Sequence, residues 1–192
     1  MKPLRYREVH LDFHTSEAVP SVGDKFDKAQ FQAALKAGHV DSITVFSKCH
    51  HGWAYHPSTA NEMHPKLKFD LLGAQLEACR EIGVNAPVYL SAGHDEKYAR
   101  RHPEDIVKWH PGDGADFLNA AYYHLICYNT PYLDYLMAQV EEVMQKYNPS
   151  GIFLDISAPR ACVCNRCIES MRKLGLDPRN PEDVKKHGDM VY

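Results

Sequence analysis

The acidic residue that ends one short apolar stretch is the first candidate for chemistry in this sequence. Residues 151–154 form an apolar run that opens on glycine and leads directly into Asp155. A run of this length, bounded in this way, predicts a strand covered on both faces. Barrel and open α/β enzymes place their catalytic groups at the carboxyl ends of such strands. Asp155 is therefore a candidate catalytic carboxylate; the alternative is a structural Asp that caps the next segment or binds loop amides.

Three earlier segments, at residues 7–14, 42–51 and 86–91, also have the pattern of a strand, and polar side chains lie at or just after the end of each one. A sugar needs several hydrogen-bond partners for its hydroxyls and an aromatic surface for its C–H face. The residues near these strand ends offer both, and we expect them to bind substrate: Asp12, His14, Lys48, His50, His51, Trp53 and His94. A single histidine is more often structural than functional, but clustering at strand ends favours binding for His50 and His51.

Four of the six cysteines have the spacing of a metal site. Cys162, Cys164 and Cys167 lie within six positions, and Cys127 precedes the helix that leads into the same strand. Disulfides fit this crowding poorly, whereas four thiolates bind Zn²⁺ tetrahedrally. We expect a structural zinc site, because four protein ligands leave no position for a substrate. The alternative is four free thiols, and the other two cysteines, Cys49 and Cys79, are expected in the core.

The remaining periodicity shows which elements position these groups. Three- and four-residue apolar spacing with capping signals predicts helices at residues 28–37, 68–82, 131–146, 165–174 and 181–186. Strands that alternate with helices imply right-handed crossovers and a parallel sheet, which is the α/β class. Polar groups at four successive strand ends are typical of the catalytic face of a (β/α)8 TIM barrel.

The chain holds four such units, whereas a barrel needs eight. We therefore expect residues 1–192 to be the N-terminal half of a barrel domain; an open four-stranded sheet is the alternative. The long segment from His94 to about Thr130 is expected to lie over the site.

Composition limits the partners. The chain has 192 residues, 44% of them hydrophobic and 24% charged, with a formal net charge of -3. This balance is typical of a soluble globular protein and gives no attraction to nucleic acid or an anionic membrane. The start of the chain lacks the apolar core of a signal peptide and no apolar run reaches ~20 residues, so we expect a cytoplasmic protein. The mild net charge suits a small uncharged substrate, and the strand-end residues described above suit a carbohydrate. Homo-oligomerisation of the full-length form stays open.

Three segments resemble α-L-fucosidase barrels. Residues 46–58, with His50 and His51, resemble the paired-histidine segment of the second strand, where the imidazoles contact sugar hydroxyls. Residues 69–91 look like the next helix and strand, and residues 151–155 are similar to the fourth strand, whose Asp is the nucleophile. One departure is Gly52, which stands where the fucosidases place an acidic residue. The whole chain resembles, more closely still, the N-terminal part of the set called hypothetical glycosyl hydrolase family 6.

The cysteines carry a second resemblance. Cys127 with Cys162, Cys164 and Cys167 looks like the four-Cys zinc site of one family of barrel β-galactosidases. Those enzymes have an Asn-Glu pair at the end of the fourth strand, whereas Asp155 and Ile156 stand here. The resemblance therefore implies the metal site without their catalytic acid.

The resemblance to fucosidases implies a retaining glycoside hydrolase in which Asp155 attacks the anomeric carbon. A second carboxyl ~5 Å away would protonate the leaving oxygen, and the candidates in this chain are Glu62, Asp95 and Glu96. A non-catalytic carbohydrate-binding or inactive barrel fragment is the alternative. A metal-dependent hydrolase is a third hypothesis, which would need an open metal site.

Overall fold

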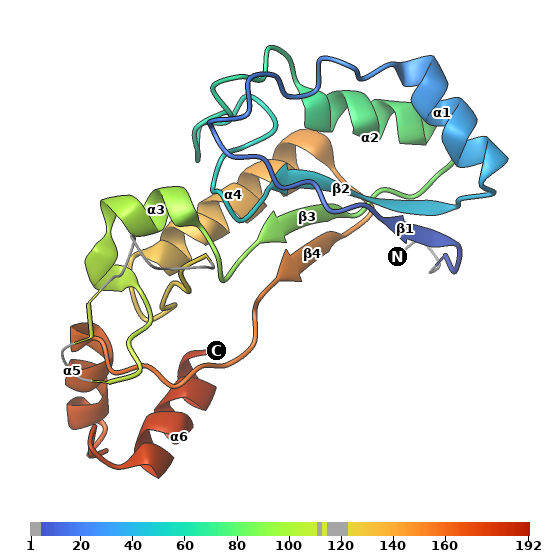
Figure 1. Ribbon diagram of the computed structural model, residues 1–192. Helices are drawn as coiled ribbons and strands as arrows, with labels where there is room; N and C mark the ends of the chain where they lie inside the picture. The colour runs from blue at the N-terminus through green and yellow to red at the C-terminus, as the bar shows by residue number, and fades with distance from the viewer. Residues whose placement is uncertain (1–4, 111–112, 115–122) are drawn as a thin grey trace. The chain divides into compact units, whose positions relative to one another are not determined.

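A four-stranded parallel sheet organises the first part of the chain. The computed structural model describes residues 5–110, 113–114 and 123–192, which fold as two compact units: Met1–Ser91 with Ala138–Asp155, and Ala92–Met137 with Ile156–Tyr192. The sheet of the first unit has the order β1-β2-β3-β4 (Figure 1), with strands β1 (Glu8–His10), β2 (Ser42–Lys48), β3 (Val88–Ser91) and β4 (Ile152–Asp155). All neighbouring pairs are parallel, which confirms the predicted α/β class and strand order.

The first strand is shorter than the alternation at residues 7–14 predicts. Its pairing with β2 ends where His10 lies opposite Thr44, so Asp12 and His14 lie in the following loop. The register between the last two strands is regular and places Tyr89 opposite Phe153 and Ser91 opposite Asp155.

The predicted caps Asp27 and Gly38 delimit the first helix, whereas the cap of the second helix, Asp70, lies inside the expected range 68–82 and was not predicted. The Asp27 side chain accepts a hydrogen bond from the Gln30 amide at the start of α1 (Lys28–Ala37), and Gly38 follows its last residue. Asp70 caps α2 (Leu71–Glu81) in the same way, through the Gly73 amide. A side-chain cap of this kind stabilises a helix by ~1 kcal/mol, because it satisfies an amide that has no partner inside the helix.

The two faces of the sheet bury different side chains. Leu35 of α1, Leu72 and Leu76 of α2, and Val143 and Tyr147 of α4 (Tyr132–Tyr147) form the main apolar cluster with strand residues. The strand residues of that cluster are Ile43, Val45, Val88 and Leu90. Strand residues alternate between faces, so Phe46 and Tyr89 point to the other face, where they pack against a second cluster. The candidate site lies on this aromatic face.

The second unit is mainly helical, and two of its elements differ from expectation. It contains α3 (Glu96–Arg101), the short 3₁₀ helix η1 (Pro103–Asp105), the first part of α4, α5 (Asn165–Lys173) and α6 (Pro181–Val191). Helix α3 was not among the expected helices, and α6 extends beyond residue 186. Among the described residues, no helix combines the length and apolar character that crossing a membrane requires.

Candidate active site

Asp155 lies at the carboxyl end of β4, on the aromatic face of the sheet. Strand alternation puts it on the same face as Phe153, whose ring stacks with that of Tyr89 at a centroid distance of 5.8 Å. The Tyr89 ring also stacks on Phe46, at 4.0 Å. The Tyr89 hydroxyl donates a hydrogen bond of 2.6 Å to Asp155 Oδ2. The carboxylate is therefore held by a phenol that comes from the neighbouring strand.

His50 is the second neighbour of this carboxylate. Its Nδ1 shares a hydrogen bond of 2.6 Å with the Ser91 hydroxyl, and its Nε2 lies 3.8 Å from Asp155 Oδ2. When Ser91 donates to Nδ1, the ring proton is on Nε2 and points towards the carboxylate. His50 thus links Ser91 to the neighbourhood of the carboxylate.

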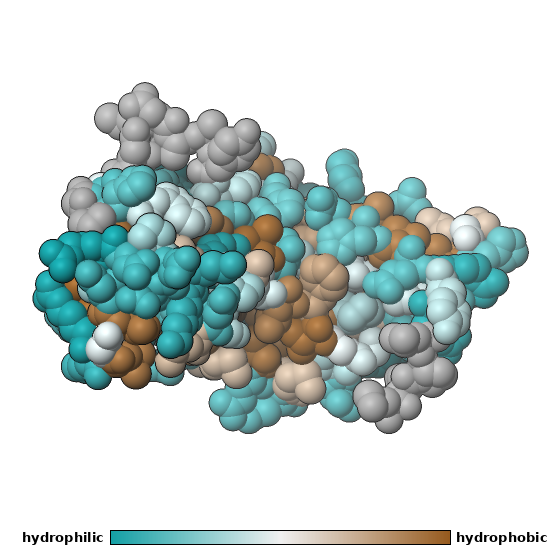
Figure 2. All heavy atoms as spheres, turned by 90° about the horizontal axis from the view of Figure 1, so that it is seen from below, coloured by the Kyte–Doolittle hydropathy of each residue, from teal (hydrophilic) through white to brown (hydrophobic). Residues whose placement is uncertain are grey.

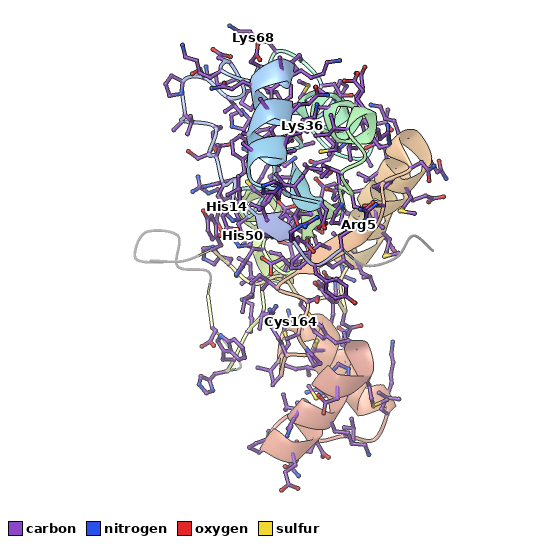
Figure 3. The ribbon with its side chains drawn as sticks, turned by 90° about the vertical axis from the view of Figure 1, so that its right-hand side faces the viewer. Arg5, His14, Lys36, His50, Lys68 and Cys164 are labelled. Atoms are coloured by element: carbon purple, nitrogen blue, oxygen red, sulfur yellow. The ribbon has the colours of Figure 1, made fainter. Side chains whose placement is uncertain are left out.

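Two further histidines and an aspartate extend the site along the sheet edge. The rings of His14 and His50 lie next to one another (Figure 3), with centroids 4.3 Å apart and planes inclined by 35°. His14 Nε2 lies 3.6 Å from Asp12 Oδ1, and His10 Nε2 lies 3.0 Å from the same oxygen. The Asp12 side chain is 72% exposed, so its carboxylate is open to a ligand. The structure thus brings together Asp12, His14, His50 and Asp155, and adds Tyr89, Ser91 and His10.

Burial fixes the protonation state of the phenol. Burial raises the pKa of Tyr89 far above its usual value, and the hydrogen bond to Asp155 raises it further. Tyr89 therefore remains a proton-bearing donor to the carboxylate at any pH used in an assay. Its position two residues before Ser91 in the same strand was the only sequence signal that it shares this face.

The three remaining predicted residues around β2 occupy different environments. Lys48 is fully buried, with 0% exposure, whereas His51 and Trp53 are half-buried in the loop that follows. The Trp53 indole donates a hydrogen bond of 3.2 Å to Glu17 Oε2. This bond orients the indole within the loop.

The loop after β2 is fixed by α4. Asn61 Nδ2 donates to the Gly52 carbonyl at 3.1 Å and to Gln139 Oε1 at 3.0 Å. The Glu142 carboxylate accepts hydrogen bonds from the Thr59 amide at 2.6 Å, the Thr59 hydroxyl at 2.8 Å and the Ser58 hydroxyl. Burial alone would raise the pKa of Glu142, but these hydrogen bonds outweigh it and lower the pKa. No pattern in the sequence predicts this anchoring role.

Two histidines of the same loop have structural roles. His56 is buried and bonds to the Ser47 hydroxyl at 2.9 Å and to the Pro57 carbonyl at 3.1 Å. His64 is buried and lies 3.0 Å from the Ser16 carbonyl.

The candidates for the second carboxyl group are exposed or occupied. Glu62 is exposed in the loop after β2. In the second unit, the buried Asp95 caps α3 through the Tyr98 amide. Glu96 pairs with His124 at 2.9 Å; burial opposes a lower pKa for Glu96, but the bonds from His124 and Arg100 outweigh it. A general acid needs a raised pKa, so Glu96 is poorly suited to that role.

His94 also belongs to the second unit. Its Nδ1 lies 3.0 Å from the His124 carbonyl oxygen, within hydrogen-bond distance.

The four predicted metal-ligating cysteines converge in the second unit. Their sulfurs all lie within 4.8 Å of one another, and all four residues are buried. A second potential ligand group in the described part of the chain is His102, Glu104 and Asp105. Asp105 there accepts a hydrogen bond of 2.8 Å from the Tyr98 hydroxyl and pairs with Arg166 at 3.7 Å, so its charge is already compensated.

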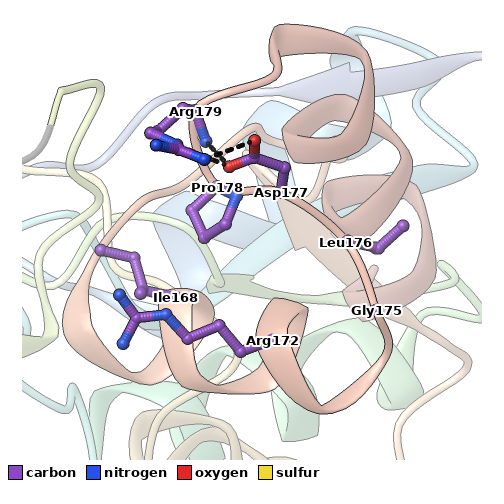
Figure 4. A pocket seen from close by; sticks show the side chains of 7 residues that line it. All are labelled: Ile168, Arg172, Gly175, Leu176, Asp177, Pro178 and Arg179. Atoms are coloured by element: carbon purple, nitrogen blue, oxygen red, sulfur yellow. Dashed lines mark hydrogen bonds and ion pairs between the residues drawn. The ribbon is translucent and has the colours of Figure 1, made fainter.

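A surface hollow of about 720 Å³ lies at the end of α5. Seven residues line it (Figure 4): Ile168, Arg172, Gly175, Leu176, Asp177, Pro178 and Arg179. None of the predicted site residues is among them. The Asp177 carboxylate there accepts from Arg179 Nε at 3.0 Å and from Nη2 at 3.1 Å, so this hollow offers no reactive carboxylate.

Several solved structures that are similar to this chain are fucosidases. α-L-Fucosidase isoenzyme 2 from Paenibacillus thiaminolyticus is 52% identical, with a TM-score of 0.93 over 98% of this chain and 29% of that protein. Isoenzyme 1 from the same organism is 19% identical, with a TM-score of 0.53 over 80% of this chain and 37% of its own. Thermotoga maritima α-fucosidase is 20% identical, with a TM-score of 0.53 over 88% of this chain and 34% of that protein. The last two likenesses concern the fold alone.

The chain spans less than a third of the length of isoenzyme 2. No curated protein matches it significantly. The family model described as hypothetical glycosyl hydrolase 6 matches residues 27–156, which is more than half of the chain and runs from the α1 cap past Asp155. The chain therefore belongs to the family of hypothetical glycosyl hydrolase 6 and is glycoside hydrolase-like at the level of the family.

Proposed function

We propose that this chain supplies the nucleophile and part of the sugar-binding surface of a retaining glycosidase that acts on α-L-fucosides. The observation that carries the proposal is the setting of Asp155, at a strand end, with the Tyr89 hydroxyl at 2.6 Å and His50 Nε2 at 3.8 Å. The 52% identity to α-L-fucosidase isoenzyme 2 supports the sugar.

In this mechanism Asp155 attacks the anomeric carbon, the glycosidic C–O bond breaks, and a second carboxyl group protonates the leaving oxygen. Water then hydrolyses the glycosyl ester, so the carboxylate is a nucleophile in the first step and a leaving group in the second. Both roles need an ionised carboxylate. The hydrogen bond from the Tyr89 hydroxyl, and His50 Nε2 at 3.8 Å, can stabilise this negative charge.

We assign sugar binding to the exposed and half-buried residues that lie beside Asp155 at the sheet edge. His14, His50 and Asp12 present nitrogen and oxygen atoms that can bind hydroxyl groups. His51, Trp53, Lys48 and His94 remain proposed contacts of the same substrate. Glu96 and Asp95 already have partners and Glu62 is exposed, and we therefore place the general acid among residues that complete the barrel.

We further propose that the four β/α units belong to an eight-unit barrel. In such a barrel the carboxyl ends of the strands meet at one mouth, and the aromatic face points inward. The outermost strand supports this, since Phe153 and Leu154 are 43% and 41% exposed, as expected for an edge that another strand would cover.

The test is hydrolysis of a nitrophenyl α-L-fucoside by the protein extended through the rest of its coding sequence. Asp155→Asn should lower kcat at least ~100-fold, a loss of ~2.7 kcal/mol in transition-state stabilisation, without loss of the fold. Asp134→Asn, at an exposed position of α4, is the matched control and should keep full activity. Sugar binding without turnover by the unmodified protein would instead indicate a carbohydrate-binding role.

A further inference from the structure

The strongest feature outside the strand-end site is the buried group of four sulfurs in the second unit. Cys127 precedes α4, Cys162 and Cys164 precede α5, and Cys167 lies in the first turn of α5. All four are buried free thiols, with no disulfide between them. Residues separated by up to 40 positions in the chain thus direct four reactive groups to one point.

The distances between the sulfurs fit one tetrahedral ion. Cys127 Sγ lies 3.4 Å from Cys167 Sγ and 3.9 Å from Cys164 Sγ. Four sulfurs at ~2.3 Å from a central zinc ion stand ~3.8 Å apart along the edges of a tetrahedron. A disulfide would need a sulfur separation of ~2.05 Å. The observed spacing therefore matches shared coordination and excludes covalent pairing.

We propose that Cys127, Cys162, Cys164 and Cys167 bind one Zn²⁺ ion through their thiolates. Thiolates are soft ligands that select zinc over magnesium, calcium or manganese, and a tetrahedral four-sulfur set is typical of zinc or iron. The site is closed because all four positions belong to the protein, so the ion is structural. This proposal does not depend on the proposed glycosidase activity.

The surroundings suit a negatively charged metal–thiolate group. Four thiolates and one Zn²⁺ carry a net charge of minus two, which needs donors when it is buried. The Cys164 amide points to Cys162 Sγ at 3.5 Å, and Asn129 Nδ2 points to Cys167 Sγ at 3.7 Å. Cys164 is also the N-cap of α5 (Figure 3), where the helix dipole favours negative charge.

The ion would hold together the apolar cluster around it. Val107, Val163, Met171 and Val184 pack with the four cysteines, and Val184 brings α6 into the same cluster. A single ion would thus connect segments of this unit that come from distant parts of the chain. The binding free energy of such a site contributes directly to folding.

The experiment measures metal content and cobalt spectra of the chain produced with zinc. We expect one zinc per chain, and substitution by Co²⁺ should give the intense thiolate-to-cobalt absorption of a tetrahedral four-sulfur site. Cys167→Ser should lose the metal and lower Tm, whereas Cys79→Ser, which replaces a buried thiol of α2 outside the cluster, should keep one zinc. The cobalt spectrum uses the unmodified chain, so the test stands even where Cys167→Ser does not fold. A chain that stays metal-free in excess zinc, or that loses metal equally in Cys79→Ser, would overturn the proposal.

Discussion

At the scale of single residues, the partners of Asp155 decide what its carboxylate can do. A carboxylate beside another carboxylate, or in an apolar pocket, becomes protonated and acts as an acid. Asp155 has a phenol donor at 2.6 Å and an imidazole nitrogen at 3.8 Å instead. Both partners can stabilise negative charge on the carboxylate, and a nucleophile carries that charge.

The contribution of the phenol can be measured by Tyr89→Phe. The change removes the hydroxyl donor while the ring still packs between Phe46 and Phe153. We expect kcat/KM on the fucoside to fall ~10- to 100-fold, or ~1.4 to 2.7 kcal/mol, because Asp155 loses the 2.6 Å hydrogen bond from the phenol.

Tyr147→Phe is the matched control for this change. The Tyr147 hydroxyl donates to Asp70, the capping residue of α2, at 2.8 Å, so its loss should lower stability and leave kcat/KM unchanged. Equal activity of Tyr89→Phe and the parent would show that the phenol only packs.

Part of the site could be predicted from residue types and part could not. Asp155, His50 and His14 were identifiable because polar residues directly after apolar runs mark strand ends. Tyr89 stands inside a strand, where tyrosine usually belongs to the core. Its role depends on the register that places Ser91 opposite Asp155, and no local pattern encodes that register.

At the scale of elements, α4 positions the loop that carries Trp53. Gln139 holds Asn61, which in turn holds the Gly52 carbonyl, and Glu142 holds Ser58 and Thr59. Hydrogen bonds to α4 thus hold this part of the loop, while Tyr55 and Leu67 of the same loop pack in the second apolar cluster.

Glu142→Gln should therefore destabilise the protein in a pH-dependent way. A hydrogen bond to a charged acceptor contributes at most ~1.5 to 3 kcal/mol to stability. Solvent screens a partly exposed carboxylate such as Glu142, and a Gln side chain still accepts hydrogen bonds, so we expect a total loss of only ~1 to 2 kcal/mol at neutral pH. The folded-state pKa of Glu142 is lowered, so its contribution is present above the ordinary Glu pKa and is lost as pH falls through the lowered value.

Urea unfolding at neutral pH and below the ordinary carboxyl range checks this prediction. The difference between parent and variant should shrink at acid pH. Glu141→Gln is the control, since Glu141 bonds only to Gln145 on the exposed surface among the contacts described, and should change stability by less than ~0.5 kcal/mol. A loss in Glu142→Gln that is the same at both pH values would contradict the role of the charge.

The ends of some helices and strands could be predicted from the sequence, and the ends of others could not. Asp27 and Gly38 delimit α1 because capping chemistry is local. Asp95 also caps a helix, α3, but its position shortly after a predicted strand favours a site acid as readily as a cap. Strand β1 ends early because a strand needs its partner, and the pairing of β1 with β2 stops at Thr44.

At the scale of the whole molecule, the exposed apolar residues of β4 test the barrel proposal. Leu154→Ala should cost less than ~1 kcal/mol in the 192-residue chain, where this side chain is 41% exposed. In the extended protein the same change should cost ~2 to 5 kcal/mol, because the helices of further β/α units would bury Leu154.

Leu90→Ala is the internal reference, because Leu90 is fully buried in the four-stranded sheet and should cost ~2 to 5 kcal/mol in both proteins. Chemical denaturation of the four variants provides the comparison. An equal, small cost of Leu154→Ala in both proteins would indicate that the sheet stays open at β4.

The most direct test of the account is to identify the residue that bonds to the sugar. A 2-fluoro-fucoside with a good leaving group slows the second step of a retaining enzyme more than the first, so the glycosyl ester accumulates. Peptide mass spectrometry of the extended protein after this treatment should locate one fucosyl group on Asp155, and Asp155→Asn should remain unlabelled. A label on any other carboxylate, or turnover that inverts the configuration without labelling, would contradict the assignment of Asp155 as the nucleophile.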